Sequence, residues 1–243
     1  MADTGFVEWL ETEQGQYVRR WVEMRHDQLV ADIFGFNAVQ IGLPQMDLLR
    51  ANRMPFRFQC SELLPAHVLA NPLELPFASA SIDLVILPHV LEFSENPHQV
   101  LREVERVLVP EGSVLITGFN PFSLWGARRR LTRQPVGAPW RGRYISVPRL
   151  KDWFTLLGLE THMGCFGCYA PALSQEKWLQ RWRFMEPAGD RWWPFAGGVY
   201  MLQAIKRVHG MRLIMPSWKD QRSAAKSLAP VIQRHTKAQR TEQ

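Results

Sequence analysis

The clearest pattern of apolar and polar positions lies in the middle of the chain. Residues 84–87 form a continuous apolar run, which predicts a strand that is buried on both faces. Polar residues and Pro97 then open a helix whose apolar positions keep helical spacing: Val100, Leu101, Val104, Val107 and Leu108. Residues 110–112 stop this helix, and residues 113–117 are apolar again. Two buried strands joined by a helix form a parallel crossover unit, and sheets built from such units bind ligands beyond the carboxyl ends of their strands.

The pattern of apolar and polar positions also predicts the other helices and strands. Further helices are predicted at 16–34, 44–52, 149–157 and 174–184, and further strands at 37–41, 55–60, 67–70, 159–169 and 198–207. Residues 120–144 read as a long loop or lid with space for a helix within 123–131. We therefore expect an N-terminal helical segment (1–34), an α/β domain (35–210) with an Arg-rich lid (120–145), and a basic, disordered tail (211–243).

Composition indicates a globular protein, with 46% hydrophobic and 21% charged residues. No run of eighteen apolar residues is present, so we expect no transmembrane segment. The first fifteen residues are polar and acidic, unlike a signal peptide. Three cysteines are too few for a disulfide framework, and we therefore expect a cytoplasmic protein.

The positive charge is unevenly distributed. The net charge is +6, and residues 113–150 contain no acidic residue but several arginines. A second basic region begins at Lys219. Such regions attract phosphates, carboxylates, nucleic acid or anionic membranes, although they also simply aid solubility. An anionic ligand is expected at Arg128–Arg130, where at most one or two of three consecutive arginines can face one pocket of a helical segment.

Residues 71–119 carry a pattern that resembles a known family. Its landmarks are Leu75-Pro76-Phe77, Ile82-Asp83, Leu91-Glu92 and the run from Arg106 to Gly112. They resemble class I S-adenosylmethionine-dependent methyltransferases of the type 11 subgroup. The resemblance implies a Rossmann-like, doubly wound α/β fold with a seven-stranded, mostly parallel sheet and one antiparallel strand near residues 198–207. It also implies S-adenosyl-L-methionine as cofactor and methyl transfer to a small or lipid-like acceptor, which can carry an anionic group.

The expected cofactor site departs from the family pattern. A glycine-rich turn should follow the first strand, because the backbone must lie close to the ligand, but only Gly42 remains and Pro44 and Met46 replace the other positions. Glu62, twenty residues later, can bind the ribose hydroxyls or lie in a loop. Asn71 replaces the acidic residue expected near the adenine, and no full helix fits between the second and third strands. The cofactor-binding residues implied by the resemblance are Gly42, Glu62, Asn71, Pro72, Leu87 and Pro88.

Two residues are candidates for contact with the acceptor. His89 follows the fourth strand and can act as a base, or can merely begin a helix. Asn120 follows the fifth strand and can orient a polar acceptor, or can form a turn before Pro121.

Other features leave alternatives open. Cys165 and Cys168 have CxxC spacing, but zinc needs about four ligands and no second pair exists, so we expect no metal. Trp178, Trp182, Trp192 and Trp193 either mark a lipid interface or pack onto the sheet. The function can instead be that of a non-catalytic binding or regulatory domain, since the glycine motif is degenerate. An RNA-directed methyltransferase is a weaker alternative, and only the charge suggests a nucleic-acid partner.

Overall fold

The computed structural model describes residues 4–131, 137–172, 182 and 185–208. These residues belong to one compact unit, Met1–Val208. The expected helix at 174–184 lies outside the described residues except for Trp182, and the expected tail at 211–243 lies wholly outside them. Among the helices that the structure describes, none is both long and apolar enough to cross a bilayer.

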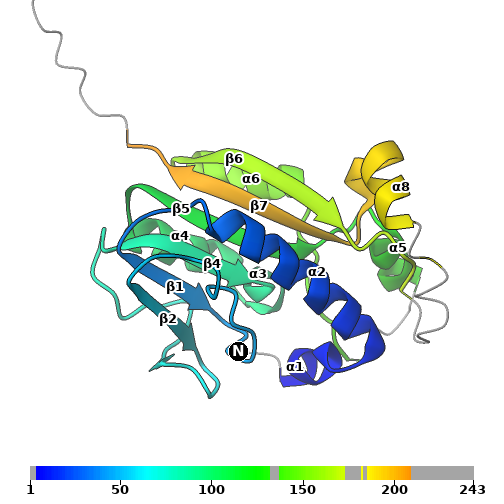
Figure 1. Cartoon of the computed structure of the whole chain (residues 1–243), viewed down its shortest axis with the longest axis horizontal. Coiled ribbons are helices and arrows are strands. Elements are labelled where there is room, and N and C mark those ends of the chain that lie inside the picture. The colour runs from blue at the N-terminus through cyan, green and yellow to red at the C-terminus, as the bar shows by residue number, and fades with distance from the viewer. Residues whose placement is uncertain (1–3, 132–136, 173–181, 183–184, 209–243) are drawn as a thin grey trace, which may run out of the picture. The chain divides into compact units, whose positions relative to one another are not determined.

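The centre of the fold is a seven-stranded sheet with the strand order β3-β2-β1-β4-β5-β7-β6 (Figure 1). The strands are β1 (Asn37–Ile41), β2 (Phe56–Ser61), β3 (Val68–Leu69), β4 (Ile82–Pro88), β5 (Leu108–Phe119), β6 (Leu159–Gly167) and β7 (Val199–Lys206). All neighbouring strands pair in parallel except β7, which runs antiparallel to both β5 and β6. The α/β fold class with one reversed strand is therefore confirmed.

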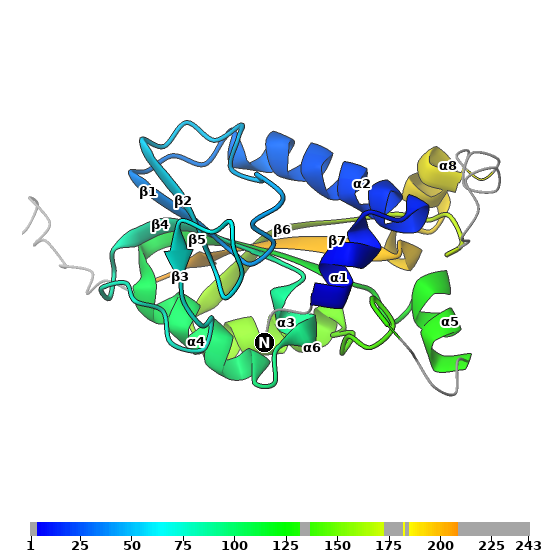
Figure 2. The ribbon, with the colours of Figure 1, turned by 90° about the horizontal axis from the view of Figure 1, so that it is seen from below.

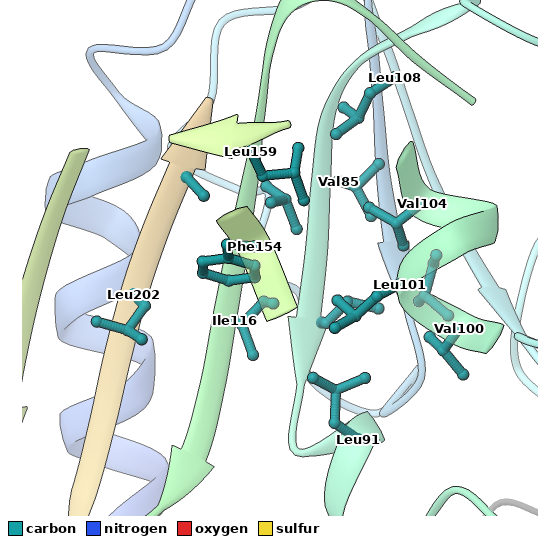
Figure 3. Packing of buried hydrophobic residues seen from close by; sticks show 14 of the residues in the cluster. Val85, Leu91, Val100, Leu101, Val104, Leu108, Ile116, Phe154, Leu159 and Leu202 are labelled. Atoms are coloured by element: carbon teal, nitrogen blue, oxygen red, sulfur yellow. The ribbon is translucent and has the colours of Figure 1, made fainter. Parts of the chain in front are cut away.

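Helices cover both faces of the sheet (Figure 2). One face carries α4 (Pro97–Val107) and α6 (Val147–Leu156), and the other carries α2 (Glu13–Val30). Helix α1 (Thr4–Leu10) precedes α2 and lies at the carboxyl edge of the sheet. Shorter helices are α3 (Val90–Phe93), α5 (Leu124–Leu131), α8 (Met185–Trp192) and the 3₁₀ helix η1 (Pro194–Ala196). Figure 3 shows the core beneath α4 and α6, where these side chains pack together: Val85, Leu91, Val100, Leu101, Val104, Leu108, Ile116, Phe154, Leu159 and Leu202.

Local chemistry explains where the main helices begin. The side chain of Asn96 accepts a hydrogen bond from the backbone N–H of Gln99, and Pro97 occupies the first turn of α4, where no N–H is needed. Thr12 caps α2 in the same way, with its hydroxyl accepting from the N–H of Gly15. The crossover unit β4-α4-β5 therefore forms as its apolar spacing predicts.

Two expectations about helices are wrong. Residues 44–52 form turns instead of a helix, and the reason lies in the side chain of Gln40, described below. Helix α1 was not expected, yet Phe6, Trp9 and Leu10 are buried on its inner face. As expected, no helix separates β2 from β3, and α5 occupies part of residues 123–131.

Candidate active site

A cavity of about 290 Å³ lies at the carboxyl ends of β1, β2 and β4. This is the edge at which open α/β sheets bind their ligands. The cavity is lined by Phe6, Val7, Gly42, Leu43, Pro44, Ser61, Glu62, Leu63, Asn71, Pro72, Leu73, Pro88, His89, Val90, Phe93, Ser94 and Glu95. Its volume is close to the lower end of the range for small-molecule sites, about 300–1,000 Å³.

Most residues expected from the sequence to form the site meet at this cavity. The lining residues among them are Gly42, Glu62, Asn71, Pro72, Pro88 and His89. Leu87 does not line it, because its side chain is fully buried in the core beneath α4. Segments separated by up to 47 residues in the chain thus converge on one pocket, as parallel strands with a common carboxyl edge require.

The turn after β1 keeps the cavity open despite the missing glycines. Gly42 adopts a φ of 82°, which favours glycine, and a Cβ built on it would lie 2.8 Å from Cγ2 of Val90. Leu43 follows with a φ of 45°. Met46 points away, since it is 2% exposed and packs in the core under α1 and α2. Pro44 borders the cavity without filling it.

The side chain of Gln40 holds this turn in place. Gln40 is fully buried on β1, and its Nε2 donates to the carbonyl oxygens of Gly42 (3.1 Å), Leu43 (2.9 Å) and Met46 (2.8 Å). Its Oε1 accepts from the N–H of Leu48 at 3.0 Å. A buried backbone that is not helical must find partners for these groups. The hydrogen bonds of Gln40 therefore take the place of the helical backbone bonds that we expected at 44–52.

The lining of the cavity is acidic. Glu62 and Glu95 are the charged side chains among the lining residues, and no lysine or arginine is among them. The carboxylate of Glu62 lies just beyond β2, where it can accept hydrogen bonds from hydroxyl groups. Asn71 uses its Oδ1 to accept from the N–H of Leu73 at 2.9 Å. The field in the cavity favours a ligand with positive charge.

A buried histidine–glutamate pair borders the cavity. His89 and Glu92 are 2% and 3% exposed, and Nδ1 of His89 lies 2.7 Å from Oε2 of Glu92. The other oxygen of Glu92 accepts from the backbone N–H of Phe119. An ionised carboxylate only accepts hydrogen bonds, so Nδ1 of His89 carries the hydrogen and Nε2 is left as an acceptor. Nε2 has no hydrogen-bond partner among the described residues.

The conformation of His89 is itself unusual. Its φ is 54°, in the left-handed region that non-glycine residues rarely adopt, and its N–H donates to the carbonyl of Thr117 at 3.0 Å. Such backbone strain is found mostly at functional sites. Burial, followed by the charge of Glu92, raises the pKa of the neighbouring Tyr144 phenol.

Helix α1 supplies a wall of the site that the sequence analysis missed. The ring of Phe6 lies 5.2 Å from the His89 ring and 4.8 Å from the Phe93 ring. The spacing of Phe6, Trp9 and Leu10 follows the i, i+3, i+4 rule of an amphipathic helix and was the signal available in the sequence. The unexpected pairing of His89 with Glu92 had a similar signal, because the two residues are three positions apart.

Asn120 has a different place in the structure from the one expected. Its Nδ2 donates to the carbonyls of Phe195 (2.8 Å) and Gly197 (3.0 Å), and its Oδ1 accepts from the N–H of Phe122 (3.0 Å). It does not line the cavity. Because both amide hydrogens are used by backbone oxygens, Asn120 fixes the turn after β5, and we do not include it among residues that contact the acceptor.

Two arginines of α5 contact aromatic rings and backbone carbonyls of this chain. The guanidinium of Arg128 lies 4.8 Å from the Trp140 ring and donates to the carbonyl of Ala172. Arg129 lies 5.1 Å from the Tyr144 ring and donates to the carbonyl of Trp140 at 3.0 Å. They attach α5 to the lid loop and lie outside the cavity lining.

The cysteines form no disulfide; Cys168 is fully buried and Cys165 is half-buried. No group of three potential metal ligands occurs among the residues that the structure describes.

Comparison with known proteins connects this geometry to a family. Residues 43–116 match the family model described as a methyltransferase domain. The uncharacterized protein YafS of Escherichia coli (strain K12) is 32% identical over 154 residues, which cover 63% of this chain and 64% of that protein. The match thus spans less than two thirds of the length of this relative.

Solved structures share the fold at low sequence identity. An S-adenosylmethionine-dependent methyltransferase from Thermotoga maritima is 16% identical, with a TM-score of 0.59 and coverage of 79% of this chain and 92% of its own. One from Archaeoglobus fulgidus is 16% identical, with a TM-score of 0.52 and coverage of 77% and 94%. A geranyl diphosphate methyltransferase in complex with S-adenosylmethionine is 15% identical, with a TM-score of 0.53 and coverage of 78% and 87%. The resemblance to the class I methyltransferase fold is therefore confirmed.

Proposed function

We propose that this chain, a class I methyltransferase by its fold and its central segment, transfers a methyl group from S-adenosylmethionine to a small or lipid-like acceptor. The observation that carries the proposal is the cavity at the carboxyl ends of β1, β2 and β4, where Gly42, Glu62 and Asn71 meet. The methyltransferase-domain match over residues 43–116 includes all lining residues of the cavity except Phe6, Val7 and Gly42, and it supports the same conclusion.

The residues present fit the cofactor. The carboxylate of Glu62 would hold the ribose hydroxyls, and Leu43, Pro72 and Leu73 offer apolar surface to a base. The positive φ of Gly42 lets the backbone approach the ligand closely where a side chain would meet Val90. The acidic lining suits a cationic sulfonium and an ammonium group.

The protein's own part in the reaction is orientation, exclusion of water and proton removal. When bound, S-adenosylmethionine supplies an electrophilic methyl group on its sulfonium. Phe6 and Phe93 line the cavity beside His89 and would exclude water from bound reactants. Holding two reactants in the correct geometry can lower a barrier by up to about 7–11 kcal/mol.

His89 would remove the proton from an acceptor hydroxyl or amine. The carboxylate of Glu92 fixes Nδ1 as the protonated nitrogen, which leaves Nε2 to accept the proton of the acceptor. The same carboxylate would then stabilise the imidazolium that forms. Glu92 itself is a positioning residue, held by the N–H of Phe119.

The apolar part of the lining supports one class of acceptor. Phe6, Leu63 and Phe93 add apolar surface to the cavity, which suits a small apolar or isoprenoid-like molecule. Geranyl diphosphate is the substrate named for one protein of this fold. An anionic group on the acceptor would lie outside the cavity, because no lysine or arginine lines it.

Calorimetric titration with S-adenosylmethionine tests the proposal. We expect saturable binding by the wild type and none by Gly42→Leu, because the added side chain would collide with Val90 and enter the turn. Gly158→Leu is the matched control: Gly158 also has a positive φ (69°), but a Cβ there meets nothing closer than 3.9 Å. Absence of binding at millimolar cofactor would favour a non-catalytic domain, and wild-type binding by Gly42→Leu would contradict the placement of the site.

The role of Glu92 can be tested without knowing the acceptor. In the wild type, ¹⁵N NMR of the imidazole should show His89 protonated at Nδ1. Glu92→Gln keeps the volume but removes the charge, and we expect the Nε2-protonated tautomer to appear while cofactor affinity is retained. An unchanged tautomer would refute this role for Glu92 and would leave the cofactor site unaffected.

A further inference from the structure

One end of the described unit exposes large apolar side chains on α5, the loop before it, α8 and η1. Both views place α5 and α8 at this same end (Figures 1 and 2). We call it the aromatic end, and its residues are Phe122, Leu124, Leu131, Trp192, Trp193 and Phe195. Their exposed fractions run from 50% for Leu124 to 83% for Leu131. Trp192 and Trp193 are 70% and 63% exposed, so the alternative that these two tryptophans pack onto the sheet is wrong.

The two segments of the aromatic end are joined through Asn120. Its side chain donates to the carbonyl of Phe195 at 2.8 Å and accepts from the N–H of Phe122 at 3.0 Å. The backbones of Phe122 and Phe195 are therefore held together, while their side chains are 64% and 75% exposed. An exposed apolar surface of this kind is uncommon on soluble monomers and marks an interaction site.

A groove of about 730 Å³ continues from Phe122 and Phe195 between α6 and the edge strand β6. Its walls include Val147 and Lys151 of α6 and Met163 and Phe166 of β6. Lys151 and His162 are the ionisable residues of this lining, and no carboxylate belongs to it. The guanidinium of Arg130 lies 5.8 Å from the Phe122 ring. Apolar surface and positive charge are thus interleaved.

We propose that the aromatic end is a docking surface for an anionic lipid bilayer. Tryptophan and phenylalanine insert at the level of the headgroups, while lysine and arginine attract anionic lipids. The absence of acidic residues from 113–150 gives the charge complementarity that this partner requires. Leu124 and Leu131 favour lipid over nucleic acid, because an aliphatic side chain gains from acyl chains but cannot stack on bases as an aromatic ring does.

The aromatic end is separate from the cofactor cavity, since the two share no lining residue. Bilayer docking can therefore succeed or fail independently of methyl transfer. It would also bring the enzyme to acceptors dissolved in the membrane.

Co-sedimentation of the full chain with vesicles tests the docking surface. We expect binding to phosphatidylglycerol vesicles and little binding to phosphatidylcholine vesicles. Trp192→Ser/Phe195→Ser should weaken the binding at least tenfold, and Arg130→Gln/Lys151→Gln should weaken it by about fivefold for each charge removed. Added salt should reduce the binding of the wild type.

The opposite end of the sheet offers a matched control. Phe36 and Phe56 are exposed to a similar extent, 70% and 64%, at the amino ends of β1 and β2. Phe36→Ser/Phe56→Ser should bind vesicles like the wild type, and all variants should melt and bind S-adenosylmethionine like the wild type.

Three results would overturn the proposal. One is no binding to phosphatidylglycerol vesicles. Another is wild-type binding by both variants of the aromatic end, which would attribute the attraction to the basic region from Lys219 onward. The third is binding to polyuridylic acid, but not to vesicles, that both variants lose, which would assign the surface to nucleic acid.

Discussion

Replacing Gln40 with alanine should destabilise the fold more than its modest size suggests. The substitution leaves the buried N–H of Leu48 without its partner and removes the donor for three carbonyl oxygens. An orphaned buried group costs about 1–3 kcal/mol. The carbonyl of Met46 costs less, because it keeps a 3.2 Å bond from Gln59.

The expected total is about 3 kcal/mol, made up of the lost hydrogen bonds and about 1 kcal/mol of lost packing. For a unit of this size, that loss lowers the melting temperature by ~6–12 °C. Thermal unfolding followed by circular dichroism measures the shift, and hydrogen exchange at the amide of Leu48 reports the local opening. Cofactor affinity should fall as well, because the turn carrying Gly42 loses its anchor.

Gln59→Ala is the matched control. It removes a single 3.2 Å bond to the same carbonyl of Met46, from a half-buried side chain, and should cost only about 0.5–1 kcal/mol. If Gln40→Ala has the same melting temperature as Gln59→Ala, the idea that Gln40 organises the turn is refuted.

Two further predictions concern titratable groups in the core. Burial is the main cause that lowers the pKa of His26 to about 4 in the folded state. In the unfolded chain the pKa of His26 is about 6.5, so the unfolded state binds the proton more readily. The contribution of neutral His26 to the free energy of unfolding is fully present above about pH 6.5, and it falls by up to about 3 kcal/mol as the pH drops towards 4. Urea unfolding measured across this range should show a weaker dependence of the free energy of unfolding on pH for His26→Gln than for the wild type. Burial raises the pKa of Cys60 to about 11 and raises the pKa of Cys168 strongly, with a smaller contribution from Glu186 to the latter. Ellman's reagent should therefore react in the native state with the half-buried Cys165 first, and equal rates at all three thiols would contradict the described burial.

The crossover unit could be predicted because its signals are local. Continuous apolar strands, the Asn96-Pro97 cap and the apolar spacing of α4 each identify their element without reference to the rest of the chain. Convergence of Gly42, Glu62 and His89 also followed from the sequence, since parallel strands end at one edge of a sheet.

The remaining features depend on tertiary contacts that spacing does not reveal. Residues 44–52 have the composition of a helix, but the buried amide of Gln40 offers their backbone other partners. Asn120 could be placed at the correct edge, yet its hydrogen bonds to Phe195 and Gly197 come from a segment 75 residues later. Pairing of His89 with Glu92 depends on the left-handed turn at His89, which its residue type does not favour.

The position of α1 has a practical consequence for anyone who handles this protein. Phe6 and Val7 line the cavity, so a purification handle or fluorescent label attached ahead of Thr4 would begin a few residues from the ligand. Such a fusion risks altering affinity in ways that resemble an inactive enzyme. Handles cut away before titration, or placed after the last residue, avoid that artefact.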